Sequence, residues 1–223
     1  RTLRPTSFTA TPTLWNGLYK EFQVDVCKRV QAMALKRDDD DYLNDANVEF
    51  EVSQEVLLEW KGKALLGNRL QLIVNSGAPI LHHVCRWLFR VFSCIVVDGY
   101  GTTETGGLTS NRTISNDVIL RLKDCPSLGY LTSDDPPRGE IVAHSPRITP
   151  GYYNCRNSEP IDDDFIDIEG KLYFKTGDIG EMTSQGNIKV IDRCKACFKL
   201  SQGLYVAPYP IEELLSTSKY VLQ

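Results

Sequence analysis

Hydrophobic positions near the N-terminus recur with the period of an α-helix. They fall on one stripe, made of Trp15, Leu18, Tyr19, Phe22, Val26 and Val30. This spacing predicts a helix that buries one face. The acidic run DDDDY at 38–42 ends the pattern. Adjacent Asp side chains could bind a cation, but such a run is more typical of a solvated loop, which we expect here. A second helix is predicted over residues 53–62.

Between residues 70 and 97 the pattern alternates between short apolar runs and a helical period. LQLIV (70–74) and CIVV (94–97) predict buried strands, and ILHHVCRWLFRVF (80–92) between them predicts a helix. A crossover through a helix makes the two strands parallel, so the segments after them, NSGAP and DGYGTTE, leave the sheet at the same edge. In open α/β sheets ligands bind along that edge.

Beyond residue 115 the pattern changes to short strands separated by Gly and Pro. The segments VILRLK, GEIVAHS, KLYF, DIGEM and NIKVI, with turns at DDPPRG, EGK and SQGN, predict an antiparallel sheet. From Asp192 onward, CFKLSQGLYVAP predicts a further hairpin and PIEELLS a helix. We therefore expect an α/β portion over 1–115, a β subdomain over 116–191, and the start of a second domain over 192–223.

The composition limits the classes of partner. The formal net charge is −4 and the sequence pI is about 5.5, which argues against binding nucleic acid through its phosphates. No run approaches the roughly 18 apolar residues of a membrane span. Seven scattered cysteines suit a reducing compartment. Cys194 and Cys197 have the spacing of a metal or redox pair, but no second pair or suitably spaced His completes a zinc site.

The stretch DGYGTTETGG at 98–107 combines glycines, hydroxyls and a carboxylate. It lacks the third glycine of the dinucleotide fingerprint GxGxxG, and the chain has no Walker A loop. One interpretation is a tight loop that needs glycines. The other is a nucleotide site, in which Tyr100 lies against a base, Thr102 and Thr103 contact phosphate, and Glu104 holds magnesium. Downstream, Asp178 in KTGDIG could accept hydrogen bonds from a ribose diol, although on its own a surface turn is the better interpretation of that Asp.

Five motifs occur in order along the chain: LQLIVNSGAPI, VDGYGTTETGG, PRGEIVAHSPRITPGYYN, YFKTGDIGE and IDRCKACFKLSQGLYVAP. Together they resemble the adenylate-forming (AMP-binding) enzymes, specifically the long-chain acyl-CoA synthetases and the adenylation domain of carboxylic acid reductases. The resemblance covers nearly the whole chain. It implies an α/β fold, in which a βαβ portion and an antiparallel β subdomain of a large adenylation domain (1–191) precede a small α+β domain, with Asp192 as the hinge.

The resemblance also implies an activity. Such enzymes activate a carboxylic acid with ATP and Mg²⁺ as an acyl-adenylate and then pass the acyl group to a thiol. This chemistry relies on positioning and charge stabilisation rather than on a nucleophilic side chain. Carried over by position, Gly77, Ala78 and Pro79 border the adenine and acyl pocket, Gly99, Tyr100 and Gly101 line the adenine face, Thr103 contacts phosphate, Glu104 holds Mg²⁺, Asp178 binds the ribose hydroxyls, Arg193 reaches the ribose or phosphate, and Lys199 faces the site during thioester formation.

Three departures from the family pattern accompany the resemblance. No segment resembles the Ser/Thr/Gly-rich, lysine-containing loop that clasps the ATP phosphates, which we expect upstream. The lysine of the adenylation step is expected beyond Gln223. The segment CKAC replaces residues that are usually charged, so the hinge region could be oxidisable, although local tolerance of the change is the plainer interpretation. We therefore expect the chain to be a fragment that is inactive alone.

Three hypotheses for the function follow. The leading one is part of a long-chain fatty acid–CoA ligase that uses CoA as co-substrate. We expect this ligase to be intracellular, in the cytoplasm or at the cytosolic face of a membrane such as the endoplasmic reticulum. Any attachment to the membrane would depend on segments outside this chain. The second is the adenylation domain of a carboxylic acid reductase, which passes the acyl group to a tethered carrier domain. The third is a non-catalytic remnant or interaction module.

Overall fold

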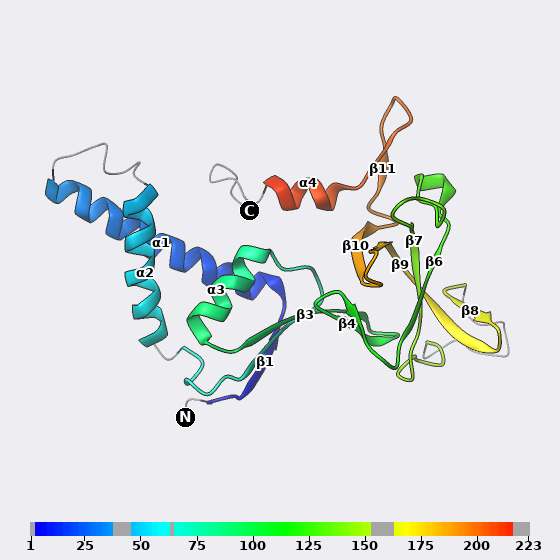
Figure 1. Cartoon of the computed structure of the whole chain (residues 1–223), viewed down its shortest axis with the longest axis horizontal. Coiled ribbons are helices and arrows are strands. Elements are labelled where there is room, and N and C mark those ends of the chain that lie inside the picture. The colour runs from blue at the N-terminus through cyan, green and yellow to red at the C-terminus, as the bar shows by residue number, and fades with distance from the viewer. Residues whose placement is uncertain (1–2, 38–45, 63–64, 153–162, 216–223) are drawn as a thin grey trace. The chain divides into compact units, whose positions relative to one another are not determined.

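The computed structural model describes residues 3–37, 46–62, 65–152 and 163–215 (Figure 1). The chain divides into two compact units, an N-terminal unit (Arg1–Asp98) and a C-terminal unit (Gly99–Gln223). Within the described residues, no helix combines the length and the hydropathy needed to cross a bilayer. The acidic loop predicted at 38–42 lies outside the described residues.

The sheet of the N-terminal unit is parallel. Its strands are β1 (Ser7–Ala10), β2 (Leu72–Asn75) and the first half of β3 (Ile95–Thr102). The predicted βαβ unit is confirmed, because β2 and β3 are parallel and the helix α3 (His82–Phe92) lies between them in the chain. Asn75 at the end of β2 pairs with Asp98, so both strands reach the same edge of the sheet together. β1, which pairs with β2, was not predicted.

Three helices pack on the sheet of the N-terminal unit. They are α1 (Pro12–Arg37), α2 (Ala46–Gly62) and α3. The stripe predicted on α1 is confirmed, and its residues share one core cluster with Ile73 of β2. At the centre of that core the rings of Trp60 and Trp87 meet edge to face, with their centroids 5.6 Å apart. α2 begins at Ala46 rather than at the predicted residue 53, and the buried residues Val48 and Val52 extend its apolar face.

Residues 99–114 form a hairpin-rich segment of the C-terminal unit. The second half of β3 pairs with β4 (Gly106–Ser110), and β4 pairs with β5 (Thr113–Ile114). The prediction of a loop over 98–107 is therefore wrong, since only residues 103–105 separate the two strands. Gly101 serves strand pairing here, because an added Cβ would meet the backbone of Gly106 and Gly107 on β4.

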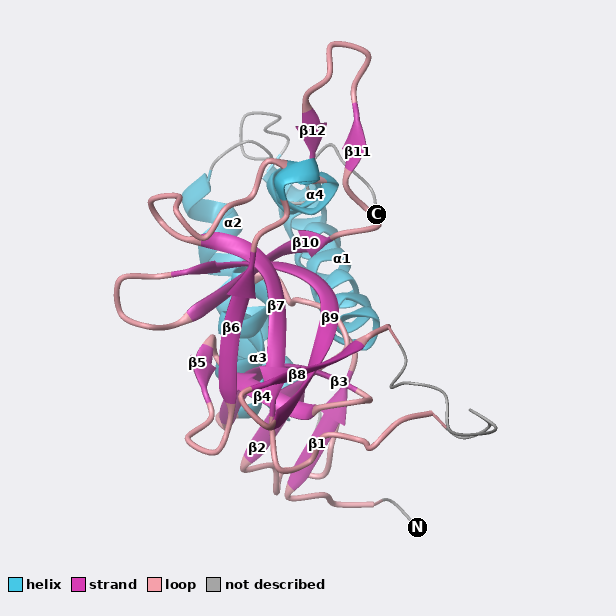
Figure 2. Cartoon of the chain, turned by 90° about the vertical axis from the view of Figure 1, so that its right-hand side faces the viewer, coloured by secondary structure: helices cyan, strands magenta, loops and turns pink. Residues whose placement is uncertain are grey.

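An antiparallel sheet fills most of the C-terminal unit, as predicted. Its strands are β6 (Ile119–Lys123), β7 (Arg138–His144), β8 (Phe165–Ile168), β9 (Lys171–Met182) and β10 (Ile188–Arg193). The order is β10–β9–β7–β6, with β8 paired to β9, and Figure 2 shows β6, β7 and β9 side by side. A short 3₁₀ helix (Pro126–Leu128) lies between β6 and β7 in the chain. KLYF and DIGEM, predicted as two strands, are one long strand, β9, and β8 was not predicted.

The last described segment contains the predicted hairpin and helix. The hairpin is formed by β11 (Phe198–Lys199) and β12 (Tyr205–Val206). The helix α4 (Pro208–Leu215) begins two residues before PIEELLS, so that two prolines lie in its first turn, where a missing backbone N–H costs no helical hydrogen bond.

Candidate active site

The turn between β3 and β4 presents two predicted site residues, Thr103 and Glu104. It is closed by Thr102 and Thr105, whose hydroxyls lie 3.1 Å apart. Each of these hydroxyls also accepts a hydrogen bond from the other residue's backbone N–H, both at 3.2 Å. Thr103 at the tip is exposed. The turn therefore holds a hydroxyl and a carboxylate toward solvent on a backbone that is fixed from both sides.

Glu104 is held by a neighbouring segment of the same unit. The Tyr152 hydroxyl donates a hydrogen bond to Oε1 of Glu104 at 2.8 Å, and the backbone N–H of Thr149 donates to its carbonyl at 2.7 Å. Partial burial raises the pKa of Glu104, but the hydrogen bonds from Tyr152, its own backbone and Thr102 outweigh that effect and hold the pKa below its ordinary value. Glu104 is therefore ionised at neutral pH. A single anionic carboxylate beside exposed hydroxyls fits Mg²⁺, which proteins often bind through one carboxylate together with substrate phosphates.

Tyr100 of β3 and Asp178 of β9 form the centre of the candidate site. The Tyr100 hydroxyl donates a hydrogen bond to Oδ2 of Asp178 at 2.8 Å, and Nε of Arg193 lies 3.3 Å from the other carboxylate oxygen, Oδ1. The Asp178 side chain is only 6% exposed, whereas that of Arg193 is 74% exposed. Burial raises the pKa of Asp178, and the hydrogen bond from Tyr100 and the charge of Arg193 offset part of that rise. Three predicted site residues thus meet in one cluster, although Tyr100 lies 78 positions before Asp178 and Arg193 lies 15 positions after it.

Asp178 owes its position to an irregularity in β9. We predicted that Asp178 lies in a turn after a strand, and this is wrong, because β9 continues through it. The pairing of β9 with β7 shifts at this point, and Gly177 has a φ of 69°, which favours glycine. The Thr176 hydroxyl donates to the carbonyl of Ile141 and accepts from the Asp178 N–H. This β-bulge re-aims a side chain within the strand, as bulges near functional sites commonly do.

Asp192, the predicted hinge residue, lies at the end of β10. Its carboxylate is buried and accepts hydrogen bonds from the backbone N–H of Arg193 at 2.7 Å and of Tyr209 at 2.9 Å. Tyr209 lies in the first turn of α4, so Asp192 stabilises the start of that helix. Lys199 belongs to β11, and its ammonium lies 5.4 Å from the centre of the Tyr205 ring. Lys199 is therefore part of the β11–β12 hairpin, and its role in thioester formation stays a prediction.

The predicted pocket residues Gly77, Ala78 and Pro79 lie in the N-terminal unit. They form an exposed turn after β2, and Gly77 has a φ of 89°. The amide of the fully buried Asn75 donates to the Ala78 carbonyl at 2.8 Å and to Oδ1 of Asp98 at 2.7 Å. This amide ties the turn to the middle of β3. That Gly77, Ala78 and Pro79 share a pocket with the residues of the C-terminal unit stays a prediction.

Several contributors were missed by sequence analysis. They are Asn75, Asp98, Thr105 and Tyr152. In the sequence Asn75 and Asp98 each directly follow an apolar run, LQLIV or CIVV. Polar residues of an α/β site are expected there, so this signal was available. Tyr152 offers no comparable signal, because its contact with Glu104 joins residues 48 positions apart.

The cysteines near the hinge are not activated thiols. Burial, the charge of Glu140 and the neighbouring Cys125 thiol raise the pKa of Cys194 to about 12, so it stays protonated at neutral pH, and a thiol is a poor nucleophile in that form. The six cysteines within the described residues are free, and no group of three potential metal ligands occurs among those residues.

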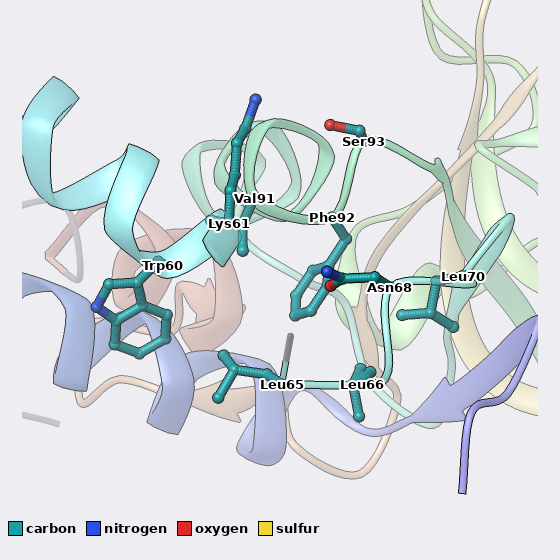
Figure 3. A pocket seen from close by; sticks show the side chains of 9 residues that line it. All are labelled: Trp60, Lys61, Leu65, Leu66, Asn68, Leu70, Val91, Phe92 and Ser93. Atoms are coloured by element: carbon teal, nitrogen blue, oxygen red, sulfur yellow. The ribbon is translucent and has the colours of Figure 1, made fainter. Parts of the chain in front are cut away.

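A separate cavity of about 220 Å³ lies in the N-terminal unit. Figure 3 shows Phe92 and the side chains of Leu65, Leu66 and Leu70 around it, with Trp60 at one end. No predicted site residue lines this cavity.

Comparison with known proteins points to one family. The model of the AMP-binding enzyme family matches residues 1–153. Long chain acyl-CoA synthetase 6, peroxisomal, from Arabidopsis thaliana is 31% identical over 99% of this chain and 33% of its own length. A carboxylic acid reductase from Mycobacterium marinum is 30% identical over 99% of this chain and 18% of its own length. The chain thus spans about a third of the synthetase and less of the reductase.

Solved structures agree in fold. The adenylation domain of a carboxylate reductase from Mycobacterium chelonae superposes with a TM-score of 0.79 at 26% identity, over 99% of this chain and 32% of that one. The adenylation and carrier didomain of the carboxylic acid reductase from Segniliparus rugosus, solved in complex with AMP, gives a TM-score of 0.72 at 28% identity, over 98% of this chain and 28% of that one. The resemblance inferred from the five motifs and the expected α/β adenylation fold are both confirmed. The chain belongs to the AMP-binding enzyme family.

Proposed function

We propose that the chain is part of an ATP-dependent acid–thiol ligase that activates a long-chain fatty acid as its acyl-adenylate and transfers it to CoA. The contacts among Tyr100, Asp178 and Arg193 carry this proposal, because they combine an aromatic ring, a buried carboxylate and an exposed cation in one place. The long-chain acyl-CoA synthetases among the relatives support the choice of acid and of acceptor.

Each residue has a role in this proposal. Tyr100 with its flanking glycines lies against the adenine, and Asp178 accepts hydrogen bonds from the ribose hydroxyls. Thr103 contacts phosphate, and Arg193 reaches the ribose or phosphate from the end of β10. Glu104 would hold Mg²⁺, which when bound supplies positive charge beside the phosphates.

The reaction has two steps. A carboxylate oxygen of the fatty acid forms a bond to the α-phosphorus of ATP, and the bond between the α-phosphorus and the bridging oxygen breaks, which releases pyrophosphate. The thiol sulfur of CoA then bonds to the acyl carbon while AMP leaves, and the thiol proton passes to solvent or a base. Both steps depend on alignment and on stabilisation of spread negative charge. Asp192 as hinge and Lys199 as a contact of the second step would serve the change between the two states.

A carboxylic acid reductase is the second candidate function. The relatives and solved structures of that class, including the adenylation domain with a TM-score of 0.79, favour it. The adenylation step is the same, but the acceptor is the thiol of a tethered carrier domain. For either candidate we propose an intracellular location, in the cytoplasm, at the cytosolic face of a membrane such as the endoplasmic reticulum or, as two Arabidopsis relatives are named, in the peroxisome.

Exchange of labelled pyrophosphate into ATP, measured on the whole ligase of which the chain is proposed to be a part, tests the first step. We expect exchange that depends on a long-chain fatty acid and on Mg²⁺, and that falls about 100-fold or more in Glu104→Gln, by analogy with the loss of one group that stabilises transition-state charge. Addition of free CoA then separates the candidates, because acyl-CoA accumulates only with a CoA ligase. Absence of exchange with any fatty acid would refute both and favour a non-catalytic module.

A further inference from the structure

The Tyr100 hydroxyl has a function that its aromatic ring does not explain. It donates a hydrogen bond to Oδ2 of Asp178 at 2.8 Å, and this bond joins β3 to β9 across 78 positions of sequence. A ring that only lies against a base needs no such bond. The hydroxyl therefore contributes to holding the Asp178 carboxylate in place.

The two oxygens of Asp178 have partners of different kinds. Oδ2 accepts from a tyrosine on β3, whereas Oδ1 faces an arginine on the neighbouring strand β10 whose side chain is 74% exposed. The contact with Arg193 is also longer, at 3.3 Å. Because the Arg193 side chain is exposed to solvent, it can leave this contact and be replaced by another donor. Oδ1 is thus the oxygen open to an incoming hydroxyl group, and Oδ2 is the oxygen that stays fixed.

We propose that Tyr100 is a positioning residue, whose hydroxyl fixes the Asp178 carboxylate so that the site selects nucleotides with a ribose diol over deoxynucleotides. This inference rests on the proposed function, because it takes the bound ligand to be an adenine nucleotide. A carboxylate with one oxygen fixed presents the other in one direction, and directional hydrogen bonds weaken steeply when the donor and acceptor are misaligned.

The electrostatics of the cluster agree with this assignment. Burial, followed by the charge of Asp178, raises the pKa of Tyr100, so its hydroxyl remains a donor throughout the physiological range. The groups that face Asp178 are Tyr100 from β3 and Arg193 and Asp192 from β10. Tyr100 and Arg193 favour the ionised carboxylate and Asp192 disfavours it. Loss of the hydroxyl would therefore raise the pKa of Asp178 further.

The test compares AMP with 2′,3′-dideoxy-AMP. Binding of each to the chain is measured by ligand-observed NMR at millimolar nucleotide without Mg²⁺, so that Glu104 has no part in the result. Wild type should prefer AMP about tenfold, the size expected for hydrogen bonds to a charged group. Tyr100→Phe, which keeps the ring, should reduce the preference to about threefold or less. The control Tyr173→Phe removes a hydroxyl from a side chain that is 1% exposed on the same strand as Asp178 and should keep the tenfold preference.

The preference for AMP over dideoxy-AMP is also measured as a function of pH, because a purely structural role of Tyr100 would not change this pH dependence. As pH falls, Tyr100→Phe should lose its remaining preference for AMP at a higher pH than wild type, because its Asp178 protonates earlier. Equal pH profiles for the variant and wild type would contradict the proposal.

The outcomes separate the two levels of inference. A tenfold preference that persists in Tyr100→Phe overturns the role of the hydroxyl and leaves the proposed function intact. A wild-type chain that binds both nucleotides equally, or neither, overturns both. If circular dichroism shows that Tyr100→Phe does not fold, the hydroxyl proton of Tyr100 in the wild type provides the test. Its NMR signal should be protected from exchange with water, and its chemical shift should change on addition of AMP but not of dideoxy-AMP. A freely exchanging hydroxyl proton overturns the proposal.

Discussion

Gly101 offers a sharp test of the β3–β4 hairpin that presents the candidate site. It pairs with Gly107 across the two strands. A Cβ atom added at Gly101 would overlap the Gly106 carbonyl oxygen and would lie 2.9 Å from the Cα of Gly107. Both obstacles are backbone atoms, so no change of rotamer can relieve them. Gly101→Ala must therefore push the two strands apart.

The expected loss follows from two opposing effects. Overpacking of this kind costs about 1–3 kcal/mol, and the upper part of that range applies because the contact is with backbone. Gly→Ala also restricts the unfolded chain, which stabilises the fold by about 0.4–1 kcal/mol. The net destabilisation of the hairpin is therefore about 2 kcal/mol. Gly107→Ala is the matched control, since its Cβ meets nothing within 4 Å, and it should be neutral or slightly stabilising.

Hydrogen exchange measured by mass spectrometry reports this difference locally. A loss of about 2 kcal/mol should speed exchange of the amides in residues 99–114 about thirtyfold in Gly101→Ala. Amides of the N-terminal unit serve as the internal reference. Exchange in residues 99–114 that is as slow in Gly101→Ala as in Gly107→Ala would refute the close approach of the two strands and the structural reason for the glycines.

Three further predictions concern the C-terminal unit. Tyr152→Phe should raise the pKa of Glu104 toward its ordinary 4.5. A carboxyl group whose pKa is lower in the folded than in the unfolded protein stabilises the fold above the unfolded pKa, and this contribution is lost as the pH falls through the folded pKa. Wild type should therefore lose more stability than the variant as the pH falls below about 4.5. Urea unfolding at several pH values measures this difference. Asp192→Ala removes the acceptor of the Tyr209 N–H, and a cost of about 1 kcal/mol should speed exchange in the first turn of α4 about fivefold; unchanged exchange would contradict the capping role. Gly180→Ala places a Cβ 2.7 Å from a side chain of β7. It should lower the free energy of unfolding of the C-terminal unit by about 1–3 kcal/mol and so lower its midpoint in urea. An unchanged midpoint would show that the core of the sheet has room for the methyl group.

Hydrophobic periodicity predicted the elements that bury one continuous face. The stripe on α1 and the βαβ unit were recovered because each packs against the same core, which imposes the period on the sequence. β1 was missed because its four residues, SFTA, carry only a weak pattern, and the strand exists by pairing with residues 72–75, more than 60 positions away. Local sequence holds little information about such long-range pairing.

The glycine-rich stretch after β3 shows how tertiary context overrides a local signal. Gly and Thr in DGYGTTETGG are typical of a loop when considered alone. In the structure Gly101 lets the two backbones pair closely, and the threonines at 102 and 105 close the turn between the strands. Thr103 and Glu104, proposed for chemistry, lie together between β3 and β4. The structural role of Gly101 was not predicted, because it depends on the residues opposite it.

The arrangement around Asp178 also divides fixed from movable contacts. Tyr100 comes from a strand whose pairing holds it in place, and its hydrogen bond to Asp178 is partly buried. Arg193 comes from the end of β10, next to the predicted hinge Asp192, and its contact with Asp178 is exposed. A rotation at Asp192 would break the hydrogen bond to the Tyr209 N–H and displace Arg193, but it would leave the Tyr100 hydrogen bond in place. The proposed ribose site would then keep its geometry while the groups at the end of β10 change, as the proposed two successive reactions at one site require.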